Sequence, residues 1–135
     1  MSKGLSLHIG VNKVDKTHYG NIVELNAAVN DAVFWESFAK KMGYSTNSLH
    51  DQNATSEKVL AQLKAYSKEL QPGDILMLTY AGHGGSIRND RPSSLDNERY
   101  DQTWCLYDRQ LLDDEIYEAF EAFRKAVRII VVSDS

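Results

Sequence analysis

The segment ILMLTYAG at residues 75–82 is apolar throughout, without the alternation of apolar and polar residues that a half-exposed strand shows. A strand of this kind is covered on both faces. The runs LSLHIGV (5–11) and VRIIVVS (127–133) have the same character. Strands buried on both faces occur mainly in parallel sheets that carry helices on either side, so the sequence predicts an α/β fold.

Helical patterns separate these strands. Three segments each place apolar side chains along one helix face: 26–42, 55–70 and 113–124. The stripe of the first segment comprises Ala28, Ala32, Trp35, Ala39 and Met42. Shorter strands are predicted at 44–50 and 103–107, and the polar stretch 84–100 is predicted to be an exposed loop.

This order of elements predicts a mainly parallel sheet with helices on both faces, in one domain. In such sheets functional residues lie just past the carboxyl ends of the strands. Three places meet this condition: the segment after Val11, GHGG at 82–85 and SDS at 133–135. We expect them at one edge of the sheet.

Composition excludes several classes of function. The net charge of −4 and the absence of a basic stripe argue against nucleic acid as a partner. No apolar run reaches membrane-spanning length, and the N-terminus lacks the features of a signal peptide, so no membrane association is expected. The single cysteine, Cys105, rules out an internal disulfide and points to a reducing, cytoplasmic location.

His83 is the strongest candidate for a catalytic residue. It directly follows the most apolar strand and is flanked by Gly82 and Gly84, which would let a ligand approach the backbone closely. Histidine can transfer protons near neutral pH, although a loop histidine without function is the plain alternative. His8, within the first strand, is predicted to be a core histidine, and Cys105 a small buried apolar residue.

Six segments resemble one family in their order and spacing. They are LSLHIGVNKVDKTHYG (5–20), NAAVNDA (26–32), LTYAGHGG (78–85), YDQTWCLYD (100–108), LLDDEI (111–116) and RIIVVSDS (128–135). Together they resemble the bacterial caspase-like cysteine peptidases of the metacaspase or orthocaspase group, peptidase family C14 of clan CD. The resemblance covers nearly the whole chain. It implies the caspase-like three-layer α/β/α sandwich, of which residues 1–135 would form the large-subunit part.

The resemblance also implies a catalytic apparatus. In that family a strand ending in Asp-Ser is followed at once by the nucleophilic cysteine, so we expect a cysteine directly after Ser135 and the rest of the domain beyond it. His83 matches the histidine of the His-Cys dyad. The amide of Gly84 matches a donor to the oxyanion, beside the amide of that cysteine.

Metacaspases cleave after Arg or Lys, and the acids that hold this P1 side chain match Asp31 and Asp134. A carboxylate facing a guanidinium forms charge-assisted hydrogen bonds. The sequence departs from the family pattern at Ala28 and Ala81, where cysteine and serine are frequent. Without the resemblance, Asp31 would be read as an acid stabilised by a helix dipole.

Calcium activates many metacaspases through acids that match Asp101, Asp113 and Asp114. The chemistry itself requires no cofactor. The alternative interpretation gives Asp113 and Asp114 a structural role, with Asp113 as the N-cap of a helix and Asp114 in its first turn.

The expected partners are peptide or protein substrates with Arg or Lys at P1, and the chain's own C-terminal remainder. The alternative function is a catalytically inactive caspase-like binding or regulatory module with the same fold. An α/β-hydrolase would need a G-x-S-x-G elbow, which the sequence lacks. A metal hydrolase is disfavoured because no second histidine has ligand spacing to His83.

Overall fold

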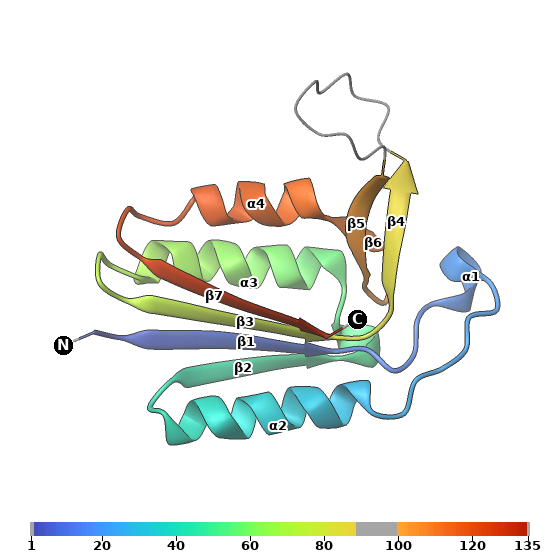
Figure 1. The fold of residues 1–135 in the computed structure, drawn as a ribbon, viewed down its shortest axis with the longest axis horizontal. Helices are drawn as coiled ribbons and strands as arrows, with labels where there is room; N and C mark the ends of the chain where they lie inside the picture. The colour runs from blue at the N-terminus through green and yellow to red at the C-terminus, as the bar shows by residue number, and fades with distance from the viewer. Residues whose placement is uncertain (1, 89–99, 135) are drawn as a thin grey trace.

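A four-stranded parallel sheet forms the centre of the structure (Figure 1). The computed structural model describes residues 2–88 and 100–134. The strands of the sheet are β1 (Gly4–Gly10), β2 (Ser45–His50), β3 (Ile75–Ala81) and β7 (Arg128–Asp134), in the order β2-β1-β3-β7. Every neighbouring pair is parallel, which confirms the predicted sheet.

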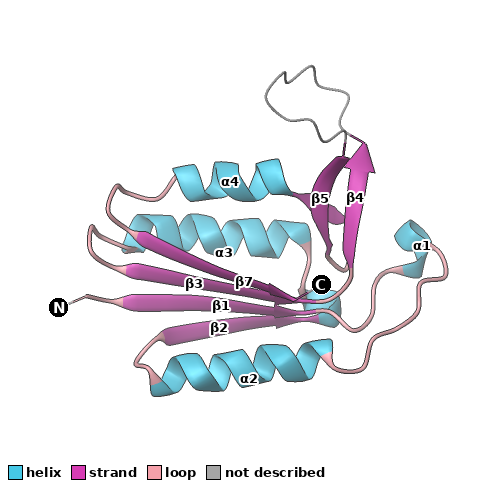
Figure 2. Ribbon diagram, viewed as in Figure 1, coloured by secondary structure: helices cyan, strands magenta, loops and turns pink. Residues whose placement is uncertain are grey.

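Helices cover both faces of this sheet (Figure 2). Helix α2 (Ala28–Lys41) lies on one face, and α3 (Ser56–Glu69) and α4 (Asp113–Glu121) lie on the other. The main apolar core lies between the sheet and this helix pair, with Leu7, Ile9, Val59, Leu63, Leu76 and Leu78 fully buried. The three-layer α/β/α sandwich is therefore confirmed. Within the described residues, no helix combines the length and apolar character needed to cross a membrane.

Small residues bring α2 close to the sheet. Ala28, Ala32 and Ala39 are buried, as their helical spacing predicts. A Cβ added to Gly10 would lie 2.8 Å from the Ala28 carbonyl oxygen, so only glycine fits beneath the helix there. The prediction for Met42 was wrong, since the helix ends at Lys41 and Met42 is 63% exposed at its C-cap.

His8 lies in a polar layer of the central sheet. It is fully buried, its Nδ1 lies 2.8 Å from Thr79 Oγ1, and its Nε2 lies 2.8 Å from Ser6 Oγ. Burial lowers the pKa of His8 to about 4. His8 is therefore a neutral core histidine with both ring nitrogens paired, as predicted.

This burial makes stability depend on pH. The unfolded chain binds a proton on His8 near pH 6.5, whereas the folded chain binds it near pH 4, so lowering the pH between these values favours unfolding. We expect the His8 contribution to the free energy of unfolding to be about 2 kcal/mol lower at pH 5 than at pH 7.5. Urea unfolding measured between pH 7.5 and pH 5 should show that the free energy of unfolding falls more steeply as the pH is lowered in the wild type than in His8→Gln. His18→Gln, at an exposed position, serves as the control. Wild-type and His8→Gln plots of unfolding free energy against pH that run parallel would contradict the prediction.

A second, antiparallel sheet stands beside the central one. It consists of β4 (Gly84–Arg88), β5 (Tyr100–Cys105) and β6 (Gln110–Leu112), in that order. The prediction of a loop over 84–100 was wrong at both of its ends, because cross-strand pairing with β5 makes a strand of the glycine-rich segment. Residues 89–99 of that predicted loop lie outside the described residues.

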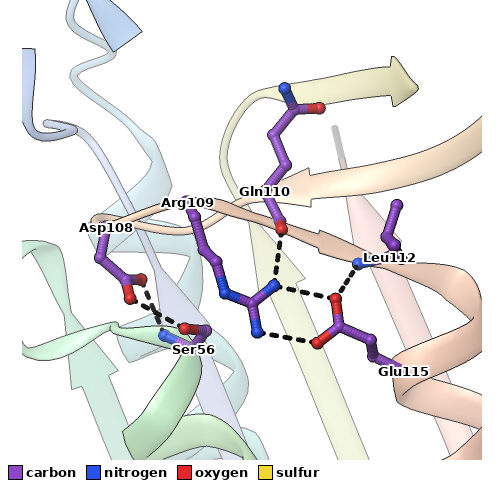
Figure 3. Close-up of polar contacts among 6 residues, drawn as sticks. All are labelled: Ser56, Asp108, Arg109, Gln110, Leu112 and Glu115. Atoms are coloured by element: carbon purple, nitrogen blue, oxygen red, sulfur yellow. Dashed lines mark hydrogen bonds and ion pairs between the residues drawn. The ribbon is translucent and has the colours of Figure 1, made fainter. Parts of the chain in front are cut away.

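Two carboxylates hold the start of α3 and the start of α4 (Figure 3). Asp108 accepts hydrogen bonds from the Ser56 amide and hydroxyl, both at 2.8 Å. Arg109 forms a bidentate ion pair with Glu115, with both N–O distances 2.8 Å. The prediction of Asp113 as N-cap was wrong: the cap position is Leu112, whose amide donates to Glu115.

Strand β7 lies at the edge of the described sheet, with β3 as its neighbour there. Ile130 is 44% exposed and Val131 is 42% exposed, and these residues face opposite sides of the strand. The prediction that this strand is covered on both faces was wrong for the described residues. The side chains of an edge strand have neighbouring side chains from only one adjacent strand, so both faces of β7 stay partly open to solvent.

Candidate active site

A pocket of about 460 Å³ lies between the carboxyl ends of β3 and β7 and the start of α2. It is lined by Leu25, Asn26, Ala27, Ala28, Asp31, Ala81, Gly82, His83, Gly84 and Asp134. We call it the strand-end pocket. All four residues for which the sequence suggested a catalytic or P1-binding role lie in its lining: His83, Gly84, Asp31 and Asp134.

The backbone of His83 is held firmly between the two sheets. Its carbonyl accepts a hydrogen bond from the Cys105 amide at 3.0 Å and one from the Tyr80 hydroxyl at 2.6 Å. The Tyr80 ring stacks on Trp104, and the Trp104 indole donates to Ser133 on β7. These contacts fix the position of the histidine relative to the end of β7.

The imidazole ring of His83 is oriented by a backbone carbonyl. Its Nε2 lies 2.7 Å from the carbonyl oxygen of Val23, in the segment before α2. A carbonyl can only accept, so Nε2 carries the proton, and in the neutral ring Nδ1 holds the free lone pair. The arrangement presents Nδ1 as a base. The sequence carried no signal for Val23, because every residue has a carbonyl group.

The amide of Gly84 points away from β5. Because the Cys105 amide donates to the His83 carbonyl, the next opposed pair, Gly84 and Trp104, is the non-hydrogen-bonded pair of the ladder. An N–H in such a pair is directed outward. A donor beside His83 in the strand-end pocket suits a developing negative charge.

The two pocket acids come from different layers. Asp31 lies in the first turn of α2, and Asp134 is the last residue of β7. The register of β3 and β7 pairs Asp134 with Ala81, two residues before His83. Two carboxylates in one pocket favour a cation, and the small side chains of Ala28 and Ala81 leave room beside them.

The acids assigned to calcium do not line this pocket. Asp113 and Asp114 begin α4, and Asp113 lines a separate pocket of about 330 Å³ near Trp104. The side chain of Asp101 lies outside the described residues. Among the residues that are described, no group of three or more potential metal ligands occurs.

The one cysteine of the sequence, Cys105, is not placed for nucleophilic chemistry. It is only 5% exposed, it does not line the strand-end pocket, and burial raises the pKa of its thiol. A thiol of this kind stays protonated and inert. The prediction of a buried, structural Cys105 is confirmed.

Comparison with known proteins identifies a family. Residues 5–135 match the family described as "Metacaspase, peptidase C14 domain". The chain is 27% identical to Metacaspase-2 of Trypanosoma brucei brucei, an alignment that covers 96% of this chain and 40% of that protein. It is 27% identical to Metacaspase-1 of Mycosarcoma maydis over 85% of this chain and 30% of that protein.

A solved structure is similar over nearly the whole chain. The crystal structure of a protein from Geobacter sulfurreducens superposes with a TM-score of 0.89 at 40% sequence identity, covering 98% of this chain and 50% of that one. The chain thus spans half or less of the length of these relatives. With the family match extending over residues 5–135, the chain belongs to the metacaspase family of C14 peptidases.

Proposed function

We propose that the full-length protein is a cysteine endopeptidase that cleaves peptide bonds after Arg or Lys, with His83 and a cysteine that follows Ser135 as the catalytic dyad. One observation carries the proposal: His83, Gly84, Asp31 and Asp134 line one pocket, and the ring of His83 is held by Val23 with Nδ1 free to accept a proton. Membership of the C14 family supports the use of a cysteine.

The proposed reaction proceeds by acyl transfer. The thiol of the cysteine gives its proton to Nδ1 of His83 and attacks the scissile carbonyl, and the Gly84 amide donates to the oxyanion. The protonated His83 then transfers the proton to the leaving amine as the C–N bond breaks. Water, deprotonated by His83, hydrolyses the thioester and releases the acid product and the thiol.

The P1 side chain enters the strand-end pocket in this proposal. Asp31 and Asp134 supply carboxylate oxygens that accept hydrogen bonds from a guanidinium or ammonium group. In a concave site with reduced solvent, such bonds contribute more than they do at an open surface. The carboxylates therefore act on substrate binding, whereas His83 and Gly84 act on the reacting carbonyl.

A further segment of the protein would complete the sheet. In the part of the chain that the structure describes, no strand pairs with the outer edge of β7, where Ile130 and Val131 are exposed. We propose that the C-terminal remainder pairs with this edge, and that the protein works in the cytoplasm, where a free catalytic thiol stays reduced.

We propose no role for calcium in the reaction, and treat activation by calcium as a property that the assay below tests. Asp113 and Asp114 do not form a complete ligand set with other described residues, since calcium takes six to eight oxygens. We therefore assign calcium no step in the reaction.

The deciding experiment identifies the residue after Ser135 and assays the full-length protein on matched peptides with Arg, Lys, Asp or Leu at P1, with calcium and with chelator. Cleavage after Arg and Lys alone would support the proposal. A residue other than cysteine, or no cleavage under either condition, would favour the non-catalytic module. That alternative has one observation in its favour: Cys105, the only cysteine of these 135 residues, is buried.

A further inference from the structure

Asn12 joins four parts of the structure at the end of β1. Its amide donates to Asp51 Oδ1 at 2.8 Å, and its own carbonyl accepts from the Leu25 amide at 2.9 Å. Its side-chain Oδ1 accepts from the amides of Ala28 at 2.9 Å and Val29 at 3.3 Å. The backbone of this half-buried residue thus holds Asp51 and the segment before α2, and its side chain holds the start of α2 itself.

The start of α2 depends on this contact. The first amides of a helix have no partner within the helix, and a side chain at the N-cap position usually accepts from them. In α2 that position is occupied by Ala27, which has no side-chain acceptor. Asn12, fifteen positions earlier in the chain, takes over this role and ties the helix end to β1.

Asp51 holds Asn12 in place from the other side. Its Oδ1 accepts from the amides of both Asn12 and Lys13, at 2.8 and 3.1 Å. The backbone of Asp51 has a φ of 47°, a left-handed conformation that few residues other than glycine adopt. The surrounding structure must stabilise Asp51 in this strained conformation. The two hydrogen bonds that its side chain accepts contribute to that stabilisation.

The segment attached to Asn12 forms one wall of the strand-end pocket. Leu25, which donates to Asn12, and Ala28, which is capped by it, both line the pocket. Asp31 follows one helical turn after Ala28. A shift of the helix start would therefore move the Asp31 carboxylate relative to Asp134, which is anchored on β7 in another layer.

We propose that Asn12, supported by Asp51, is a positioning residue that sets the Asp31 wall of the pocket and thereby its selection of a basic P1 side chain. The inference rests on the proposed function. It adds two residues that touch neither the substrate nor the reacting atoms in that proposal.

The test measures binding of benzamidine, a planar cation that mimics an arginine side chain, to the full-length protein by calorimetry. This readout needs no turnover. Asn12→Ala should weaken binding of benzamidine about tenfold, because the uncapped start of α2 no longer holds the Asp31 carboxylate in place. Asn12→Asp retains an oxygen that can cap the helix and should bind within about threefold of the wild type.

Two controls separate positioning from general damage. Asn47, in β2, does not line the pocket, and Asn47→Ala removes its side-chain hydrogen bond to Tyr66 of α3. This variant should leave binding unchanged. Amide hydrogen exchange at Ala28 and Val29 should accelerate in Asn12→Ala and not in Asn47→Ala. Should Asn12→Ala not fold, Asp51→Ala takes its place, with weaker binding expected for the same reason.

The outcomes distinguish the inference from the proposed function. Equal binding by wild type and Asn12→Ala would overturn the role of Asn12 alone. Equal losses in Asn12→Ala and Asn12→Asp would show that capping is not its mechanism. If the wild type itself neither binds benzamidine nor cleaves after Arg, the basic pocket is wrong, and the role of Asn12 in selecting a basic side chain falls with it.

Discussion

Replacing His83 by alanine should lower kcat/KM for peptide cleavage by about a thousandfold or more in the full-length protein. In the proposed reaction, His83 is the group that accepts the thiol proton and protonates the leaving amine, so the variant lacks both functions. The loss should appear mainly in kcat, because the proposed role of His83 is at the reacting atoms and not at the P1 side chain. Steady-state kinetics on an Arg-P1 peptide measures it.

A second histidine, His18, offers a matched control. His18 is exposed on the short helix α1 (Lys16–Tyr19), where its ring contacts Tyr19. His18→Ala removes the same side chain without touching the strand-end pocket and should leave kcat/KM within about twofold of wild type. Activity of His83→Ala within tenfold of wild type would contradict the assignment of His83 as acid and base.

Replacing either pocket acid by its amide should lower kcat/KM for Arg-P1 and Lys-P1 peptides about a hundredfold. Asp31→Asn and Asp134→Asn each keep the shape of the side chain and remove the charge that, in the proposed function, pairs with the substrate cation. For a peptide with a neutral P1 residue, kcat/KM should fall far less in these variants. Comparison of the two substrates in each variant separates loss of specificity from loss of catalysis.

Glu36→Gln is the control for Asp31→Asn, because Glu36 lies on the same helix but does not line the pocket. The amide variant keeps an oxygen that can accept from the Ser48 hydroxyl, which donates to Glu36 at 2.6 Å. Its specificity should match that of the wild type. Equal losses for basic and neutral P1 peptides in the Asp31 and Asp134 variants would assign these acids a structural role instead.

The apolar runs are enough to predict the central sheet. Continuous apolar character at 75–82 implies burial on both faces, and the carboxyl ends of parallel strands meet at one edge. These two facts locate the segment after Val11, His83 and Asp134 at a common edge, and the structure places all three there. The resemblance to metacaspases added Asp31 and the expected cysteine, which patterning alone does not suggest.

Other features depend on contacts between distant segments, which leave no local pattern. The glycine-rich stretch after His83 has the composition of a loop, because its strand forms only through pairing with β5. The exposure of β7 depends on which strands flank it, and not on its own composition.

The fold class and the sheet edge that carries the candidate site both follow from the periodicity and order of the apolar segments. The way in which that site is assembled depends on contacts that appear only in the folded chain. The carbonyl of Val23 on His83 and the cap from Asn12 to α2 join residues sixty and sixteen positions apart. Backbone carbonyls and amides are the same in every residue, so the choice of partner is made by the packing that brings them together.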